Sequence, residues 1–162
     1  MPWESVASRL MEITEPPRSA ERRRADVLER FERESDVWVA TADDGGLPCL
    51  VALWFVWDGA AFWLCTRVGN PTGRNLRNGG RTRLALADTQ DVVLVDGEVE
   101  TFPREDVPAA AAEAFVAKTG WDPRGDSASY AFFRVRPRAV QAWRGVHELR
   151  GRHLMREGVW IG

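Results

Sequence analysis

Residues 19–34 carry a helical pattern of apolar and polar positions. Val27, Leu28 and Phe31 recur three to four positions apart among charged residues, and Ser19 is suited to cap the N-terminus. The charges are spaced to pair between positions i and i+4. We predict a surface helix with a thin apolar stripe and a solvated charged face.

From residue 36 onward the pattern changes to a period of two, which is typical of strands separated by Gly- and Asp-containing turns. A second helix is predicted at 106–118, with Pro108 in its first turn and Gly120 just beyond its end. The predicted strands are 36–42, 48–57, 60–66, 81–87, 91–102, 129–136 and 138–143. They indicate a mainly β protein with flanking helices, built as a six- to seven-stranded antiparallel barrel of Greek-key or meander type.

The strand 48–57 is apolar on both faces, whereas most barrel strands alternate. One face carries Leu50 and Trp54, and the other carries Val51 and Phe55. We expect one face to line the barrel interior and the other to be covered by a helix or by a partner subunit.

The length of 162 residues suits one domain, with an N-terminal helical segment (1–35), a barrel (36–143) and a polar tail (144–162). No apolar run approaches the ~18 residues of a membrane span, and the N-terminus lacks a signal-peptide pattern. The net charge of −2 gives no indication of nucleic-acid or membrane binding. We expect a cytoplasmic protein.

The cysteines and histidines do not form a metal-binding pattern. Cys49 and Cys65 are predicted to be reduced, buried thiols, with Cys65 opposite roughly residue 52 across the turn near Asp58. His147 and His153 lie in the tail without a third ligand nearby, so no metal site is expected.

The segment GNPTGRNLRNGG, residues 69–80, lies between two apolar runs and matches neither a P-loop nor a GxGxxG motif. It nevertheless contains the components of a phosphate site: a strand end at Thr66, guanidinium groups at Arg67 and Arg74, and a short helix beginning near Pro71 or Thr72. The alternative, which spacing alone favours, is a Gly/Pro-rich loop with surface arginines.

Catalytic residues are not identified, because the chain has no GxSxG elbow and no evident acid–base pair. Most tryptophans fit strand packing. Trp143 differs, because it ends a strand directly before an Arg-rich tail, where an indole ring could contact a flat ligand.

Two regions resemble the pyridoxamine 5′-phosphate oxidase-like family of flavin and deazaflavin split-barrel proteins. VWVATADDGGLPCLVALWFVWDGAAFWLCTRVGNPTGRNLRNGGRTRLALAD resembles the family's hairpin, third strand and phosphate loop, and WRGVHELRGRHLMREGVWI resembles the C-terminal segment of the oxidases. The resemblance covers most of residues 36–161. It implies an FMN-binding split barrel, with FMN as the cofactor or the deazaflavin coenzyme F420 as the alternative.

The family's site residues carry over by position. Thr66, Gly69, Trp143 and Arg152 match the family's Thr, Gly, Trp and Arg, while Asn70-Pro71-Thr72 replaces Ser-Arg-Lys and loses both charges. We expect Arg67 and Arg74 to supply the guanidinium groups. The cofactor-binding residues implied in this way are Thr66, Arg67, Gly69, Asn70, Thr72, Arg74, Asn75, Trp143 and Arg152.

The tail also departs from the oxidases, because Glu148-Leu149-Arg150 stands in place of a substrate-binding Arg-Leu-His. A vitamin phosphate is therefore disfavoured as the substrate. The resemblance implies a homodimer with the site between subunits, transferring hydride to or from an unidentified small organic substrate. The alternative is a non-catalytic flavin- or haem-binding protein, or a structural dimer with a decayed site.

Overall fold

The computed structural model describes residues 15–162. The first 14 residues lie outside the described part. They include the N-terminus that is predicted to lack a signal peptide and the start of the predicted helical segment 1–35. The main elements are α2 (Ala20–Arg33), β1 (Asp36–Ala42), β2 (Pro48–Trp57), β3 (Phe62–Arg67), α3 (Pro71–Gly79), β4 (Arg81–Ala85), β5 (Val92–Pro103), α4 (Ala109–Thr119), β6 (Tyr130–Trp143), β7 (His153–Arg156) and β8 (Val159–Trp160).

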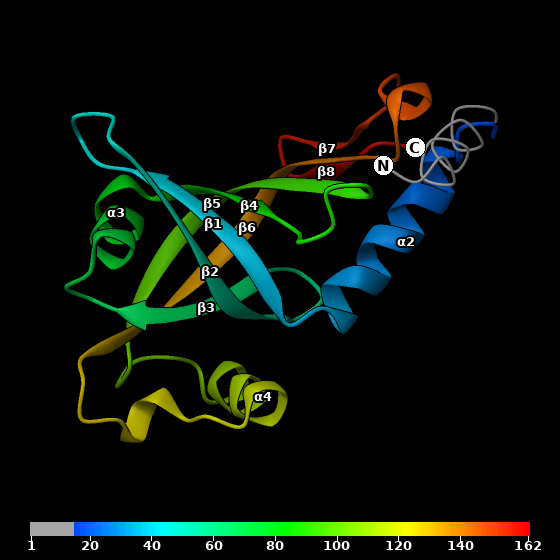
Figure 1. Ribbon diagram of the computed structural model, residues 1–162. Coiled ribbons are helices and arrows are strands. Elements are labelled where there is room, and N and C mark those ends of the chain that lie inside the picture. Colours follow the sequence, from blue (N-terminus) through cyan, green and yellow to red (C-terminus); the bar gives the residue numbers. More distant parts are fainter. Residues whose placement is uncertain (1–14) are drawn as a thin grey trace, which may run out of the picture.

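The strands form one antiparallel sheet in the order β3-β2-β1-β4-β5-β6-β7-β8. An additional pairing between β3 and β6 closes the first six strands of this order into a barrel, and β7 and β8 extend the sheet beyond it. The predicted antiparallel split barrel is therefore confirmed. In Figure 1, α2 and α3 lie at opposite sides of the barrel and α4 lies beside β3.

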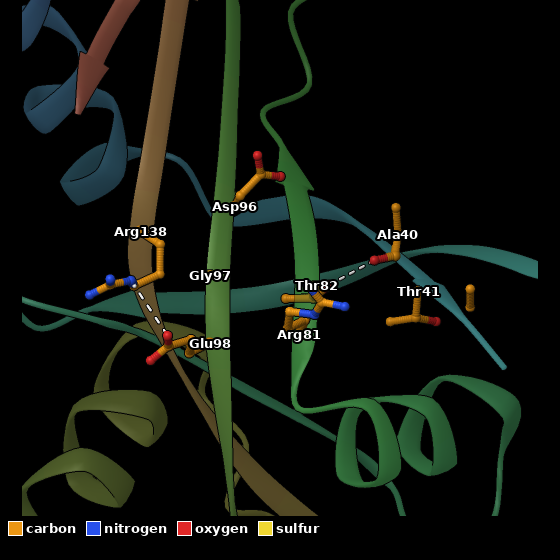
Figure 2. Close-up of a pocket in the computed structure, with 9 residues that line it drawn as sticks. Ala40, Thr41, Arg81, Thr82, Asp96, Gly97, Glu98 and Arg138 are labelled. Atoms are coloured by element: carbon orange, nitrogen blue, oxygen red, sulfur yellow. Dashed lines mark hydrogen bonds and ion pairs between the residues drawn. The ribbon is translucent and has the colours of Figure 1, made fainter. Parts of the chain in front are cut away.

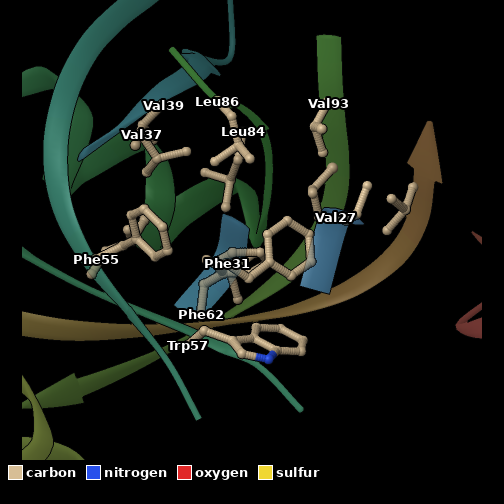
Figure 3. Close-up of a cluster of buried hydrophobic side chains, with 14 of the residues drawn as sticks. Val27, Phe31, Val37, Val39, Phe55, Trp57, Phe62, Leu84, Leu86 and Val93 are labelled. Atoms are coloured by element: carbon tan, nitrogen blue, oxygen red, sulfur yellow. The ribbon is translucent and has the colours of Figure 1, made fainter. Parts of the chain in front are cut away.

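The barrel interior is filled by alternate residues of the strands and by both flanking helices. Val27 and Phe31 of α2 and Leu76 of α3 belong to this core. Phe31 packs against the rings of Trp57 and Phe62, with ring centroids 5.0 and 4.6 Å apart (Figure 3). The narrow apolar stripe of α2 therefore closes one end of the barrel, while α3 contributes to the core from another side.

The predicted helix at 19–34 is confirmed, since Ser19 caps α2 by accepting a hydrogen bond from the Arg22 N–H. Its charged face is not wholly solvated, however. Arg23 and Arg30 are only 3% and 6% exposed. Arg23 donates to the carbonyl oxygens of Ala142 in β6 and Glu148 in the tail, and Arg30 donates to that of Asp91, just before β5.

Two predicted strands, 129–136 and 138–143, are one continuous strand, β6. Pro137, which lies between the two predicted ranges, pairs with Gly97 at a register shift between β5 and β6, where a residue without an N–H is tolerated. The tail, predicted only as polar, contributes β7 and β8. The helix predicted from 106 begins at Ala109, because Pro108 has non-helical backbone angles.

The hairpin of β2 and β3 places Cys65 opposite Trp54 rather than residue 52, since Phe55 pairs with Leu64. Both cysteines are free thiols, as expected. Cys65 is buried, whereas Cys49 is only partly buried.

The strand β2 is apolar on both faces, but one chain covers its outer face only in part. Val56 packs beneath Ala112 and Phe115 of α4. Leu50 and Trp54, further along the same face, remain 62% and 46% exposed. The helix therefore accounts for one end of this face and leaves the other end bare.

Candidate functional site

The predicted phosphate loop connects the end of β3 to the start of α3, and Asn70 organises it. Its side-chain oxygen accepts a hydrogen bond from the Gly73 N–H (2.7 Å), and its amide nitrogen donates to Oγ1 of Thr66 (3.0 Å). Asn at the cap followed by Pro at the first helical position is a strong start signal for a helix. The predicted helix start near Pro71 is therefore confirmed.

Gly73, rather than Gly69, is the glycine that this loop requires. A Cβ atom at position 73 would lie 2.1 Å from the carbonyl oxygen of Arg67, whereas a Cβ at Gly69 would meet nothing within 4 Å. The absent side chain lets the first turn of α3 pack directly onto the end of β3. Sequence reasoning missed this role, although a glycine inside a short helix is an unfavourable choice without such a reason.

A pocket of about 380 Å³ opens beside this junction. Its size is at the lower end of the range for small-molecule sites, roughly 300–1,000 Å³. The residues that line it come from β1, β2, β3, the α3 cap, α4, the segment after α4 and the start of β6: Asp36, Ala52, Leu53, Trp54, Cys65, Thr66, Arg67, Asn70, Phe115, Trp121 and Tyr130.

Aromatic side chains form one wall of this pocket. The ring of Trp121 lies 6.4 Å from Trp54, 6.2 Å from Phe115 and 4.8 Å from Tyr130, each in an edge-to-face arrangement. The Trp121 indole also donates to Asp126 over 3.4 Å. Sequence reasoning assigned Trp54 to strand packing and did not single out Trp121, because only the folded chain brings these four rings together.

Arg67 is held beside this aromatic wall. Its guanidinium carbon lies 5.8 Å from the centroid of the Tyr130 ring, and its Nε donates to the Tyr130 hydroxyl over 3.4 Å. Its side chain is exposed to solvent. The pocket therefore combines an apolar wall with a cation and with the hydroxyl and amide groups of Thr66 and Asn70.

Three other predicted loop residues hold α3 in place and do not line the pocket. Thr72 is buried with its Oγ1 3.4 Å from Sγ of Cys49. Asn75 is buried and donates to Oγ1 of Thr41 over 3.1 Å. Arg74 donates to the carbonyl oxygen of Gly69 and so closes the loop on itself.

The tail residues Trp143 and Arg152 lie far from the loop within one chain. Thr66 pairs with Ala131 near the start of β6, and Trp143 ends that strand 12 residues later, opposite Val92. At about 3.3 Å per residue, an extended strand of that length spans roughly 40 Å. The two groups of predicted cofactor ligands therefore do not meet in a single chain.

The thiol of Cys65 faces the pocket but is poorly suited to nucleophilic chemistry. Burial, and secondarily the charge of Asp126, raise the pKa of Cys65 to about 12. A thiol with such a pKa carries almost no thiolate at neutral pH.

We expect iodoacetamide at pH 8 to alkylate Cys65 more slowly than Cys49 by about 100-fold or more, because Cys65 is buried and protonated. Peptide mass spectrometry of a time course measures both rates. In urea-unfolded protein the two rates should converge, and equal rates in the native protein would contradict this result.

Across the outer faces of β1 and β2, large apolar side chains lie in the open. Trp38 is 44% exposed and faces Ala52 across the strand pair, next to Leu50 and Trp54. We refer to Trp38, Leu50, Ala52 and Trp54 as the bare face.

A second hollow, about 620 Å³, lies on the outer faces of β1, β4 and β5 over Ala40, Thr82 and Gly97 (Figure 2). Arg138 and Glu98 form an ion pair at its rim.

The six-stranded closure and the loop between β3 and α3 agree with a match between residues 24–144 and the sequence profile described as pyridoxamine 5′-phosphate oxidase. The chain belongs to the pyridoxamine 5′-phosphate oxidase family. No curated protein matches its sequence significantly.

Solved structures of members of this family and of related proteins share the fold at low identity. An F420 reductase is 24% identical with a TM-score of 0.58, covering 69% of this chain and 93% of the other. The haem-storage protein HutZ of Vibrio cholerae is 14% identical with a TM-score of 0.62, covering 76% and 97%. A candidate pyridoxamine 5′-phosphate oxidase of Listeria innocua is 13% identical with a TM-score of 0.61, covering 75% and 98%.

In this family member, few cations of the loop between β3 and α3 face the 380 Å³ pocket. Among the loop residues, Arg67 supplies the guanidinium that lines it. Within residues 15–162, no group of three or more His, Cys, Asp and Glu side chains could hold a metal ion. None of the described helices is long and apolar enough to cross a membrane.

Proposed function

We propose that this chain is a flavin- or deazaflavin-dependent oxidoreductase that binds FMN, or alternatively coenzyme F420, and acts on a small organic substrate. The observation that carries the proposal is the pocket at the β3–α3 junction, where four aromatic rings stand beside Thr66, Arg67 and Asn70. A tricyclic ring needs an apolar wall, and a phosphate needs donors and a positive charge.

The residues present fit such a group. The edge-to-face ring contacts of Trp121 hold a rigid wall against which a planar ring can pack. Asn70 and Thr66 are already bonded to each other, so their polar atoms are oriented before a ligand arrives. A bound flavin or deazaflavin would supply hydride transfer, and the protein would orient it and exclude water.

We extend the proposal to a homodimer that shares its sites between subunits. Trp143 and Arg152 are too far from Thr66 to act on the same cofactor within one chain. The bare face offers an uncovered apolar surface of the kind that subunits bury. A cytoplasmic location is proposed as well, and the two free thiols agree with a reducing compartment.

Titration of the purified protein with FMN, and separately with coenzyme F420, followed by fluorescence quenching, tests this function. We expect stoichiometric binding of one of them. Replacing Arg67 with alanine should weaken that binding about tenfold or more, because a charge-assisted bond to the phosphate is lost. Arg77→Ala removes an exposed arginine from the last turn of α3 and should leave the affinity unchanged.

The absence of binding to either cofactor, or an equal effect of both substitutions, would overturn this assignment of the site. Catalysis is tested separately. The bound cofactor should be reduced by a nicotinamide-dependent or a sugar-phosphate-dependent donor, and an organic acceptor should then reoxidise it.

A second candidate function, non-catalytic haem binding, is favoured by the loss of the loop cations at Pro71 and Thr72. Among residues lining the pocket, Cys65 and Tyr130 are the side chains that could ligate iron. The raised pKa of Cys65 opposes ligation by its sulfur. A haem absorbance band that shifts on adding the protein, without flavin binding, would favour this alternative.

A further inference from the structure

The tail that carries Trp143 and Arg152 contains little regular structure of its own. Between the end of β6 at Trp143 and the start of β7 at His153, a short 3₁₀ turn at Val146–Glu148 is the one regular element. The ends of this connection are joined by the hydrogen bond from the Ala142 N–H to the carbonyl oxygen of Arg152 (2.9 Å), and the turn has its own bonds from the Glu148 and Leu149 N–H groups. Contacts from elsewhere determine how the stretch between these ends lies against the barrel.

One guanidinium group from α2 binds the backbone at three points, one at the end of β6 and two in the tail. Nη1 of Arg23 donates to the carbonyl oxygens of Ala142 (3.2 Å) and Glu148 (2.9 Å), and Nη2 donates to that of Arg150 (3.4 Å). Arg23 is only 3% exposed. The bonds therefore come before and after the turn, on both sides of Trp143 and close to Arg152.

The carboxylate of Glu148 binds the same tail from within. It is 1% exposed and accepts hydrogen bonds from the Arg144 N–H (2.7 Å), the Arg18 N–H (3.0 Å) and Nη2 of Arg18 (2.8 Å). Burial alone would raise the pKa of Glu148, but the bonds from Arg18 and Arg144 outweigh it and lower the pKa to about 2. This carboxylate is therefore committed to contacts within the chain.

We propose that Arg23 and Glu148 are positioning residues that fix the segment 142–152, so that Trp143 and Arg152 are preorganised for the cofactor. The inference rests on the proposed function in naming what the segment binds. The pair acts on backbone groups and on Arg18. Trp143 and Arg152 themselves bond to neither positioning side chain, and Arg152 instead bonds to Gln141 and to the carbonyl of Leu149.

The arrangement explains why Arg23 is buried, although most charged residues of α2 face water. A buried guanidinium must satisfy its donors, and backbone carbonyl groups of a segment with little regular structure provide suitable acceptors. A segment ordered in advance loses less entropy when it binds a ligand, so its affinity is higher for the same contacts. Helix α2 thereby links the barrel end to the tail.

The test is hydrogen–deuterium exchange of the full chain, combined with FMN and coenzyme F420 titrations, on the wild type and on Arg23→Ala. We expect exchange in 142–152 to become faster by about tenfold or more, and cofactor binding to weaken by a similar factor, because the three hydrogen bonds from Arg23 to this segment are lost. The strands of the barrel should keep their protection. Millimolar guanidinium should partly restore both properties in Arg23→Ala by refilling the vacated site.

Two variants on the same helix serve as controls. Arg22→Ala removes an exposed arginine that pairs with Asp26, and it should change neither property. Arg30→Ala removes a buried arginine that bonds to Asp91 and Glu34 but not to the segment 142–152, so it should lower stability without loosening that segment. If Arg23→Ala does not fold, Glu148→Gln keeps the shape of the side chain and should loosen the segment in the same way.

Unchanged exchange in both positioning variants would overturn the inference, and so would equal loosening by Arg30→Ala. Loosening of the segment with unchanged cofactor affinity would also overturn it, since the segment would then not serve the cofactor. If the wild type binds neither cofactor, the proposed function fails, while faster exchange confined to 142–152 still supports the positioning of the tail by Arg23.

Discussion

Replacing Gly73 with alanine is expected to lower the free energy of unfolding by about 3 kcal/mol and to abolish binding of FMN or coenzyme F420. The added Cβ would lie 2.1 Å from the carbonyl oxygen of Arg67 and 3.1 Å from Oδ1 of Asn70. Backbone cannot give way as a side-chain end can, so α3 must move off the end of β3. That movement would separate Asn70 from Thr66 and dismantle the polar end of the pocket. Urea unfolding and cofactor titration measure the two effects.

Gly79→Ala is the matched control, because it makes the same change in the same helix. A Cβ at Gly79 would meet nothing within 4 Å, and the residue does not have a positive φ. Alanine there should raise stability by about 0.5 kcal/mol, as expected of the better helix former. The close approach at Gly73 would be refuted if both substitutions had the same effect.

Local signals in the sequence were sufficient for the elements that start the chain and build the hairpins. Ser19 before an amphipathic run specified α2, and Asn70-Pro71 specified the start of α3. The period of two specified the strands of the barrel. These features depend on neighbours in sequence, so reading the sequence in order can find them.

Features that depend on distant partners could not be predicted in this way. Arg23 reads as one of several exposed charges until the fold brings the carbonyl groups of residues 142, 148 and 150 around it. Pro137 reads as a strand break until β5 supplies a register shift opposite it. The strand β7 has only four residues, too few to be recognised without its pairing to β6.

The candidate site shows the same division. The loop residues Thr66, Arg67 and Asn70 follow from a motif of adjacent positions, and they line the pocket. The aromatic wall does not follow from such a motif, because Trp54 and Trp121 are in contact but lie in segments far apart in the sequence. Thr72 and Asn75 matched the motif equally well, but the rotation of α3 turns them toward β2 and β1.

Leu50→Glu is expected to convert the proposed dimer to a monomer and to weaken cofactor binding about 100-fold or more, without lowering the stability of the chain itself. Leu50 is 62% exposed on the bare face, so a carboxylate there is solvated in the monomer and costs little. In a dimer that buries this face, the same carboxylate would lose its water without gaining a partner. Loss of the second chain would remove Trp143 and Arg152 of the partner subunit from each site, and two lost contacts of about 1.4 kcal/mol each correspond to this factor. Light scattering after size-exclusion chromatography, with FMN and coenzyme F420 titrations on the same fractions, measures both effects.

Leu47→Glu makes the same substitution at a residue that is 69% exposed in the turn before β2, outside the bare face, and should leave both properties unchanged. A monomeric Leu50→Glu variant with full cofactor occupancy would show that each chain binds its cofactor alone. If Leu50→Glu remains a dimer, the interface does not lie on the bare face of β1 and β2. The combined outcome therefore determines whether the distance along β6 between the loop and the tail is bridged by a second subunit, which is the step on which the shared site depends.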